Sequence, residues 1–145
     1  MECRMPLVMS ESEEAKIKEI LADAKSIAII GLSPDETKDS NRVAKYLIAA
    51  GYEVIPVYPK EETILGQKVH RSLGEIDKPI DIVNVFRKGE FLAAVVDEAK
   101  KISPKLIWGQ IGCYDDAAEQ AAKDAGLNIV THRCIMIEHR KFFGK

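Results

Sequence analysis

The stretch Ser26-Ile27-Ala28-Ile29-Ile30-Gly31 decides the fold. It is an almost unbroken apolar run ending at a glycine, which is typical of a strand buried on both faces of a sheet. A polar loop over residues 32–40 follows, and apolar residues between 43 and 48 then recur at helical spacing until Gly51. The sequence therefore predicts a strand, a loop and a helix in succession, the unit from which parallel α/β sheets are built.

The same alternation continues to the end of the chain. Further strands are predicted over residues 54–57, 81–86, 106–109 and 128–131, with helices over 91–99 and 117–125 and a first helix that starts at a capping box, Ser10 to Glu13. Pro56 cannot donate a ladder hydrogen bond, so it should lie near a strand end or a bulge. The segment 61–76 is ambiguous and holds at most a short strand and a turn. The prediction is one three-layer, doubly wound α/β domain spanning residues 1–145, Rossmann-like, with a mostly parallel five-stranded sheet and flexible residues 1–9.

Composition narrows the class of protein. The 145 residues are 46% hydrophobic and 30% charged with a net charge of −2, which describes a globular protein without the positive field that attracts nucleic acid. No apolar run is long enough to cross a membrane and the first ten residues do not form a signal peptide, so a cytoplasmic location is expected. Three widely separated cysteines, Cys3, Cys113 and Cys134, exclude a disulfide framework.

Ligands of doubly wound sheets bind beyond the carboxyl ends of the strands, where the strand order reverses. The loop after the first strand is the most informative one, since Gly31 allows close backbone approach, Ser33 offers a hydroxyl, and Ser40 or Asn41 can cap the next helix. A helix N-terminus presents free N–H groups to an anion. A plain strand-to-helix turn is an equally good interpretation of the loop by itself, and its position favours a phosphate site. On this view Gly31→Val abolishes nucleotide binding and leaves the domain folded.

The loop lacks the second and third glycines of the G-x-G-x-x-G fingerprint, which disfavours an NAD site. The second strand ends Val57-Tyr58-Pro59-Lys60, without the acid that binds the ribose of NAD, and Lys60 suits a phosphate instead. Arg87 adds a second cation after the third strand, and Phe86 can pack beside an adenine or a pantetheine. Each of these residues is also an ordinary surface charge or core aromatic in other proteins.

Several stretches in this order resemble the small bacterial and archaeal CoA-binding proteins, relatives of the CoA-binding domain of succinyl-CoA synthetase α chains. They are Ile29–Pro34, Arg42–Leu47, Gly51–Val57, Ile64–Val69, Asp81–Arg87, Trp108–Gly112 and Arg133–Glu138. The resemblance implies that coenzyme A is the ligand and that three groups of residues surround it. Its phosphates would meet Gly31, Leu32, Ser33, Pro34, Asn41 and Arg42; its adenosine would meet Val57, Tyr58, Pro59 and Lys60; and the rest would meet Val85, Phe86, Arg87, Gln110, Ile111 and Gly112. The family usually has Asn-Pro-Asn where this chain has Tyr58-Pro59-Lys60.

No catalytic constellation emerges from the sequence, and binding of CoA or acyl-CoA without catalysis is favoured. The phosphorylated histidine of the related synthetases lies on a further domain with no counterpart in these residues. His132, Cys134 and His139 are not spaced like a zinc site, so no metal is expected. The alternatives are an NADP-dependent oxidoreductase, an acyl-CoA-processing enzyme and a module that reports CoA to a protein partner; a disulfide between CoA and Cys113 or Cys134 is a further hypothesis.

Overall fold

The structure is a computed structural model that describes residues 6–144, with side chains from residue 13 onward. Five parallel strands form one sheet in the order β2-β1-β5-β6-β7. Their bounds are Ser26–Ile30 (β1), Glu53–Val57 (β2), Ile82–Val85 (β5), Leu106–Gly109 (β6) and Ile129–Val130 (β7). The predicted Rossmann-like α/β fold is confirmed, and every strand that the sequence predicted is present, although the last is shorter than expected.

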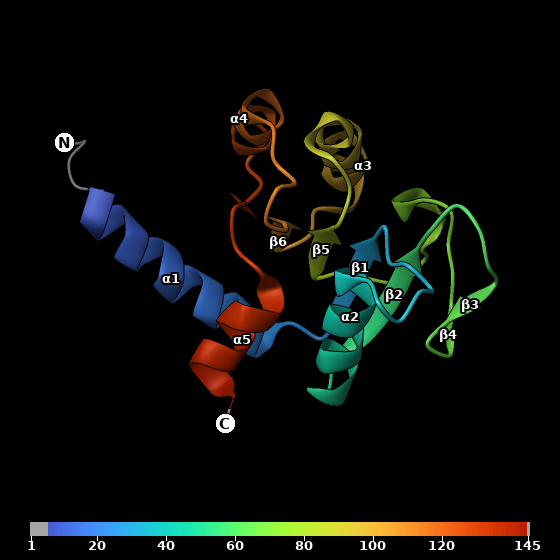
Figure 1. Cartoon of the computed structure of the whole chain (residues 1–145). Coiled ribbons are helices and arrows are strands. Elements are labelled where there is room, and N and C mark those ends of the chain that lie inside the picture. Colours follow the sequence, from blue (N-terminus) through green and yellow to red (C-terminus); the bar gives the residue numbers. More distant parts are fainter. Residues whose placement is uncertain (1–5, 145) are drawn as a thin grey trace.

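Helices cover both faces of the sheet (Figure 1). On one side lie α3 (Leu92–Ile102), which follows the 3-10 turn η2 (Gly89–Phe91), and α4 (Asp116–Asp124); on the other lie α1 (Pro6–Asp23), α2 (Asp39–Ala49) and α5 (Ile135–Phe143). Successive strand residues point to opposite faces, so Ile27 and Ile29 pack with α1, α2 and α5, while Ala28 and Ile30 pack with α3 and α4. Both faces of β1 are therefore dry, which explains its continuous apolar run.

Pro56 lies inside β2 because this strand is at the edge of the sheet. The carbonyl oxygen of Pro56 accepts from His70 N (2.9 Å), and Tyr58 N donates to His70 O (3.0 Å), so these residues face away from β1. The nitrogen of Pro56 consequently breaks no pairing with β1, and no bulge is needed. The ambiguous segment forms a small hairpin of β3 (Thr63–Ile64) and β4 (Gln67–Lys68) followed by the turn η1 (Leu73–Glu75), beyond β2 and on the opposite side from α1 (Figure 1).

The predicted start of the first helix is wrong. Helix α1 begins at Pro6, so Ser10 lies within the helix instead of capping it, and residues 6–9 are helical. The expectation of flexibility for residues 1–5, and Cys3 with it, lies outside the described residues. A capping box is a local pattern, and a helix can continue through it when good helix formers precede it.

The chain end, which the sequence did not place, packs across α2 as helix α5. The phenol of Tyr46 forms a hydrogen bond with His139 Nδ1 (2.7 Å), and the Tyr52 ring meets the imidazole edge-on at 5.6 Å. Burial lowers the pKa of His139 below its ordinary value. Tyr46 and His139 therefore join helices that are far apart in the sequence.

The free energy of unfolding is expected to fall as the pH drops through the ordinary histidine pKa of about 6.5. Because the pKa of His139 is depressed in the folded protein, the unfolded chain takes up the proton first, and the stability present at higher pH is lost. His139→Gln should flatten this dependence between about pH 7.5 and pH 5.5 in urea unfolding. His132→Asn, a change at an exposed histidine, serves as the control, and an equal flattening in both variants would contradict the role of His139.

Candidate functional site

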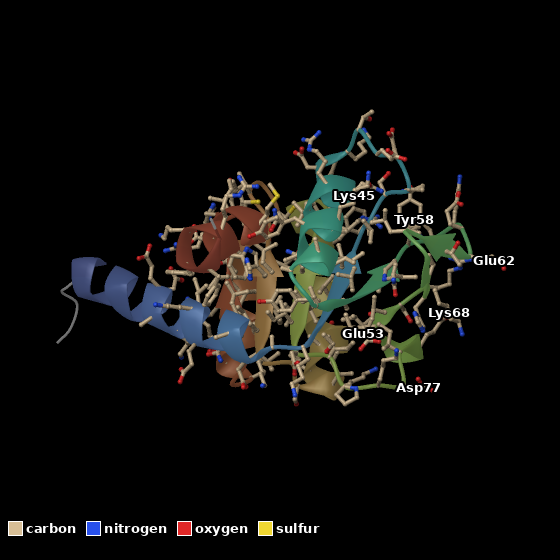
Figure 2. The ribbon with its side chains drawn as sticks, turned by 90° about the horizontal axis from the view of Figure 1, so that it is seen from below. Lys45, Glu53, Tyr58, Glu62, Lys68 and Asp77 are labelled. Atoms are coloured by element: carbon tan, nitrogen blue, oxygen red, sulfur yellow. The ribbon has the colours of Figure 1, made fainter. Side chains whose placement is uncertain are left out.

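The strand order reverses at β1, with β2 on one side and β5 on the other. In doubly wound sheets the ligand crevice lies outside the carboxyl ends of the strands at such a point. Gly31 directly follows β1 and Phe86 directly follows β5, so the two loops chosen from the sequence meet there. Figure 2 shows the same edge from another side, with Glu53 and Tyr58 marking the two ends of β2.

Gly31 is required by the protein's own backbone. Its φ is +88°, its N–H donates to Val57 O (2.9 Å), and a Cβ at this position would lie 2.8 Å from Phe86 O. Phe86 N in turn donates to Ile30 O (2.8 Å). The close approach predicted for Gly31 therefore exists, and its partner is the chain at the end of β5.

The loop after Gly31 is held against α2 by two buried side chains. Ser33 N donates to Ser40 Oγ (3.0 Å), and Asn41 Nδ2 donates to Ser33 O (2.9 Å). Neither Ser40 nor Asn41 caps α2, which corrects the sequence prediction: the N-cap is Lys38, and it makes no side-chain cap hydrogen bond. The beginning of α2 thus faces the carboxyl edge without a side-chain cap.

Arg42 lies in the first turn of α2 and is paired. Its guanidinium bonds the Asp39 carboxylate and also reaches Thr37 O (3.4 Å). The Asp39 carboxylate offsets its charge, so Arg42 offers an incoming anion less than an unpaired arginine would.

Besides Asn41, three more of the predicted site residues turn their side chains inward. Leu32 and Val85 are fully buried and belong to the core. Gln110 is also buried, and its Oε1 accepts from Asn84 Nδ2 (3.1 Å) and from Ile135 N (2.9 Å), the first residue of α5. The side chain of Gln110 is thus engaged inside the protein, where it caps α5.

Two cavities flank the point where Gly31 meets Phe86. The α3 cavity, of about 190 Å³, lies between the end of β2 and helix α3 and is lined by Ile30, Val57, Tyr58, Pro59, Arg71, Ser72, Arg87, Phe91, Ala94, Val95 and Glu98. The α5 cavity, of about 300 Å³, lies between the starts of α2 and α5 and is lined by Asp39, Arg42, Val43, Phe86, Gln110, Ile111, Cys113, Cys134, Met136 and Ile137. The two cavities share no residue, and the dipeptide Phe86-Arg87 contributes one side chain to each.

Eight of the sixteen predicted site residues line these cavities. They are Val57, Tyr58, Pro59 and Arg87 in the α3 cavity, and Arg42, Phe86, Gln110 and Ile111 in the α5 cavity. The residues that line neither cavity are Gly31, Leu32, Ser33, Pro34, Asn41, Lys60, Val85 and Gly112. Gly31, Ser33, Pro34 and Asn41 belong to the loop and helix start between the cavities, whereas Lys60 is exposed.

Sequence reasoning missed several lining residues. Arg71 follows the small hairpin in the segment that the sequence left ambiguous, and Met136 and Ile137 lie on α5, which was not predicted as a helix. The aromatic ring of Phe91 was assigned to the face of a helix, yet it lies under the Arg87 guanidinium at 4.4 Å. No single-residue signal marks these positions; their role comes from elements that are short or at the chain end.

The polar chemistry of the two cavities differs. The α3 cavity contains two arginines, Arg71 and Arg87, and one carboxylate, Glu98, whose Oε1 accepts from Leu73 N (3.1 Å). The α5 cavity is mainly apolar and sulfur-rich, and burial raises the pKa of its Cys113 thiol, which disfavours the reactive thiolate. No histidine is found among the described residues that line the two cavities.

Two further findings concern metals and membranes. His139, one of the three weighed metal ligands, forms a hydrogen bond with Tyr46. Among the side chains that the structure describes, from residue 13 onward, no three histidines, cysteines or carboxylates gather closely enough to hold a metal ion. No helix in the same range combines the length and the apolar character needed to cross a bilayer.

Comparison with known proteins identifies relatives of about the same length as this chain and others that are much longer. The Bacillus subtilis (strain 168) protein YneT, which is uncharacterized, is 42% identical over 131 residues, covering 90% of this chain and 97% of YneT. The ADP-forming acetate–CoA ligase of Methanocaldococcus jannaschii is 26% identical over 121 residues, covering 78% of this chain but only 17% of the ligase.

Solved structures share the whole fold. A hypothetical protein from Pyrococcus horikoshii OT3 has a TM-score of 0.89 at 39% identity, covering 99% of this chain and 100% of that one. A Thermus thermophilus protein has a TM-score of 0.86 at 34% identity, covering 90% and 98%. Residues 25–140 match the family model described as the CoA binding domain. As the resemblance in its sequence predicted, the chain belongs to the CoA binding domain family.

Proposed function

We propose that this protein binds coenzyme A, or an acyl-CoA, across its carboxyl edge and carries out no chemistry of its own. The observation that carries the proposal is the pair of unlike cavities on either side of Gly31 and Phe86. Coenzyme A also has two unlike ends, a phosphorylated adenosine and a pantetheine arm with a thiol, joined by a pyrophosphate. Membership of the CoA binding domain family supports this choice of ligand.

The character of each cavity supports one assignment of the two ends of CoA. The α3 cavity offers Tyr58, Pro59 and the Arg87–Phe91 pair, which suit a flat base and the ribose. The α5 cavity offers Ile111, Met136 and two thiols, which suit an uncharged arm. The pyrophosphate then crosses between them, over the Gly31 loop and the uncapped start of α2, where backbone N–H groups and the helix dipole favour an anion.

The groups that would surround the thiol end support binding without catalysis. General acid–base or nucleophilic catalysis on a thioester needs a nucleophile or base near the sulfur. In the α5 cavity the carboxylate of Asp39 is paired with Arg42, and burial raises the pKa of the Cys113 thiol, which disfavours its reactive thiolate. The raised pKa also weighs against rapid disulfide formation between Cys113 and CoA.

Two enzyme functions remain as alternatives and predict turnover. An NADP-dependent oxidoreductase would place the phosphorylated ribose of NADP⁺ in the α3 cavity, and an acyl-CoA-processing enzyme would place a thioester in the α5 cavity. The acetate–CoA ligase relative is several times longer than this chain, so its activity is not transferred with the shared segment. Hydride transfer from NADPH, or hydrolysis of acetyl-CoA by the purified protein, would replace the proposed function with one of these.

Native mass spectrometry and calorimetry test the ligand. The purified protein is expected to bind one CoA per chain, with NADP⁺ binding more weakly, and saturation at about 100 times Kd should raise the free energy of unfolding by about 2.7 kcal/mol. A protein that binds neither CoA nor acetyl-CoA would sink the proposal.

A matched pair of alanines on α3 tests where the adenosine binds. Ala94 is exposed and lines the α3 cavity, whereas its neighbour Ala93 is exposed outside the cavity. Ala94→Glu is expected to weaken CoA binding roughly tenfold or more, because it places a carboxylate beside the phosphorylated ligand. Ala93→Glu makes the same chemical change on the same helix and should leave the Kd within about twofold. Equal effects of the two variants would show that the ligand lies elsewhere.

A further inference from the structure

We propose that Arg71 recognises the phosphate on the ribose of CoA and so selects CoA over its dephosphorylated form. The inference rests on the proposed function, and it gives Arg71 the phosphate contact for which the sequence indicated Lys60 as a suitable cation at the adenosine end. Arg71 lines the α3 cavity, and one edge of its guanidinium is anchored to the loop after β2.

One nitrogen of the Arg71 guanidinium fixes the loop after β2. Nη1 donates to Tyr58 O (3.0 Å), Lys60 O (2.9 Å) and Glu61 O (2.9 Å). The backbone of Arg71 is held as well, since its N–H donates to Glu75 Oε1 (2.9 Å). The guanidinium is therefore held in one orientation beside Tyr58 and Pro59. Because it is already ordered, ligand binding costs little further side-chain entropy.

The other edge of the guanidinium is open to a ligand. Among residues 13–144, whose side chains the structure describes, none forms a hydrogen bond or ion pair with Nε or Nη2 of Arg71. These two nitrogens form the fork that binds a phosphate or carboxylate through two parallel hydrogen bonds. A pre-oriented fork at a cavity that takes a nucleotide is suited to a terminal phosphate group.

The neighbouring cations are less suited to this task. Lys60 and Arg71 are both exposed, but Lys60 does not line the cavity, and its carbonyl oxygen accepts from Arg71. Arg87 also lines the α3 cavity, stacked on Phe91 at 4.4 Å, but its Cδ would lie 3.0 Å from a Cβ at Gly31, so its charge is close to the loop proposed for the pyrophosphate.

Glu98 makes the charge of the α3 cavity mixed. A general positive field is therefore too weak to select an extra phosphate, and selection requires direct bonds from a fixed guanidinium. The loss of Arg71 should therefore weaken the binding of CoA and not that of dephospho-CoA. A residue that only held the loop in place would affect both ligands.

Calorimetric titration of CoA and dephospho-CoA against three proteins tests the assignment. The wild-type chain is expected to prefer CoA by roughly tenfold to a hundredfold, the range for charged hydrogen bonds. Arg71→Gln should abolish this preference while its Kd for dephospho-CoA stays within about threefold, and Lys60→Gln should keep the preference. Arg71→Lys retains the positive charge but not the fork, so this variant should show only part of the wild-type preference for CoA over dephospho-CoA.

The other outcomes are equally informative. If Arg71→Gln weakens both ligands alike, Arg71 is only a scaffold for the loop and the proposal is overturned; loss of the preference in Lys60→Gln alone would return the role to Lys60. If Arg71→Gln does not fold, Arg71→Lys decides the question, because undiminished preference in that variant overturns the role of the fork. If wild type binds neither ligand, the proposed function fails. If wild type binds NADP⁺ tightly and Arg71→Gln abolishes that binding, Arg71 still binds a ribose phosphate, but the ligand is NADP⁺ and the proposed function is wrong.

Discussion

Gly31→Val is expected to lower the free energy of unfolding by about 3 kcal/mol or more, enough to unfold much of a marginally stable domain. Two effects add. A β-branched residue at φ +88° is strained, and its Cβ would lie 2.8 Å from Phe86 O and 3.0 Å from Arg87 Cδ. Phe86 O is backbone at the end of a central strand, so it cannot swing away as a flexible side chain would.

Gly112 provides the control for this effect. Its φ is also +88°, yet a Cβ there would meet no atom within 4 Å. Urea unfolding of Gly31→Ala and Gly112→Ala should show a clearly larger loss for Gly31→Ala, and the difference measures the clash apart from the strain. Equal losses in the two alanine variants would mean that the end of β5 shifts freely to make room.

The expected loss of stability changes how ligand binding by Gly31 variants must be interpreted. The sequence predicted that Gly31→Val would abolish binding in a folded domain, because the close approach was attributed to the ligand. The structure attributes it to Phe86, so lost binding in that variant would follow from lost structure. Surface changes such as Ala94→Glu therefore test the site more directly.

The sequence predicted the sheet well because its strands are buried on both faces. Such strands are continuous apolar runs, and a run such as Ser26–Ile30 needs no alternation to be recognised. The topological rules then place the crevice at the reversal of strand order, which is where Gly31 and Phe86 meet. What the rules do not supply is the direction in which each side chain points.

Side-chain direction explains most of the differences at the site. Leu32 and Gln110 both follow strands at the carboxyl edge, the position typical of ligand contacts, yet both point into the core. Arg71 is separated from its partners Tyr58 and Lys60 by a hairpin whose strands have two residues each. Elements this short leave no periodicity in the sequence, so the residue that completes the α3 cavity could not be recognised from it.

Gln110→Leu is expected to lower the free energy of unfolding by roughly 2–4 kcal/mol, because it removes the acceptor of two buried N–H groups. One belongs to Asn84 Nδ2, whose second hydrogen bond, to Trp108 O (3.2 Å), remains. The other is the N–H of Ile135, at the start of a helix whose N-cap, Cys134, makes no side-chain cap hydrogen bond. Because Gln110 joins β5 to the start of α5 through these two hydrogen bonds, its loss should also loosen the wall of the α5 cavity formed by Met136 and Ile137.

Gln120→Leu is the matched control because Gln120 is exposed on α4. This substitution should change the free energy of unfolding by no more than about 0.5 kcal/mol. The double variant Asn84→Leu, Gln110→Leu should be less destabilised than the sum of its two single changes, because it removes a donor together with its acceptor. Strict additivity would show that the Asn84–Gln110 hydrogen bond contributes nothing. Additivity combined with a stable Gln110→Leu would mean that α5 is held in place by its contacts with α2, Tyr46 to His139 among them, and not by this cap.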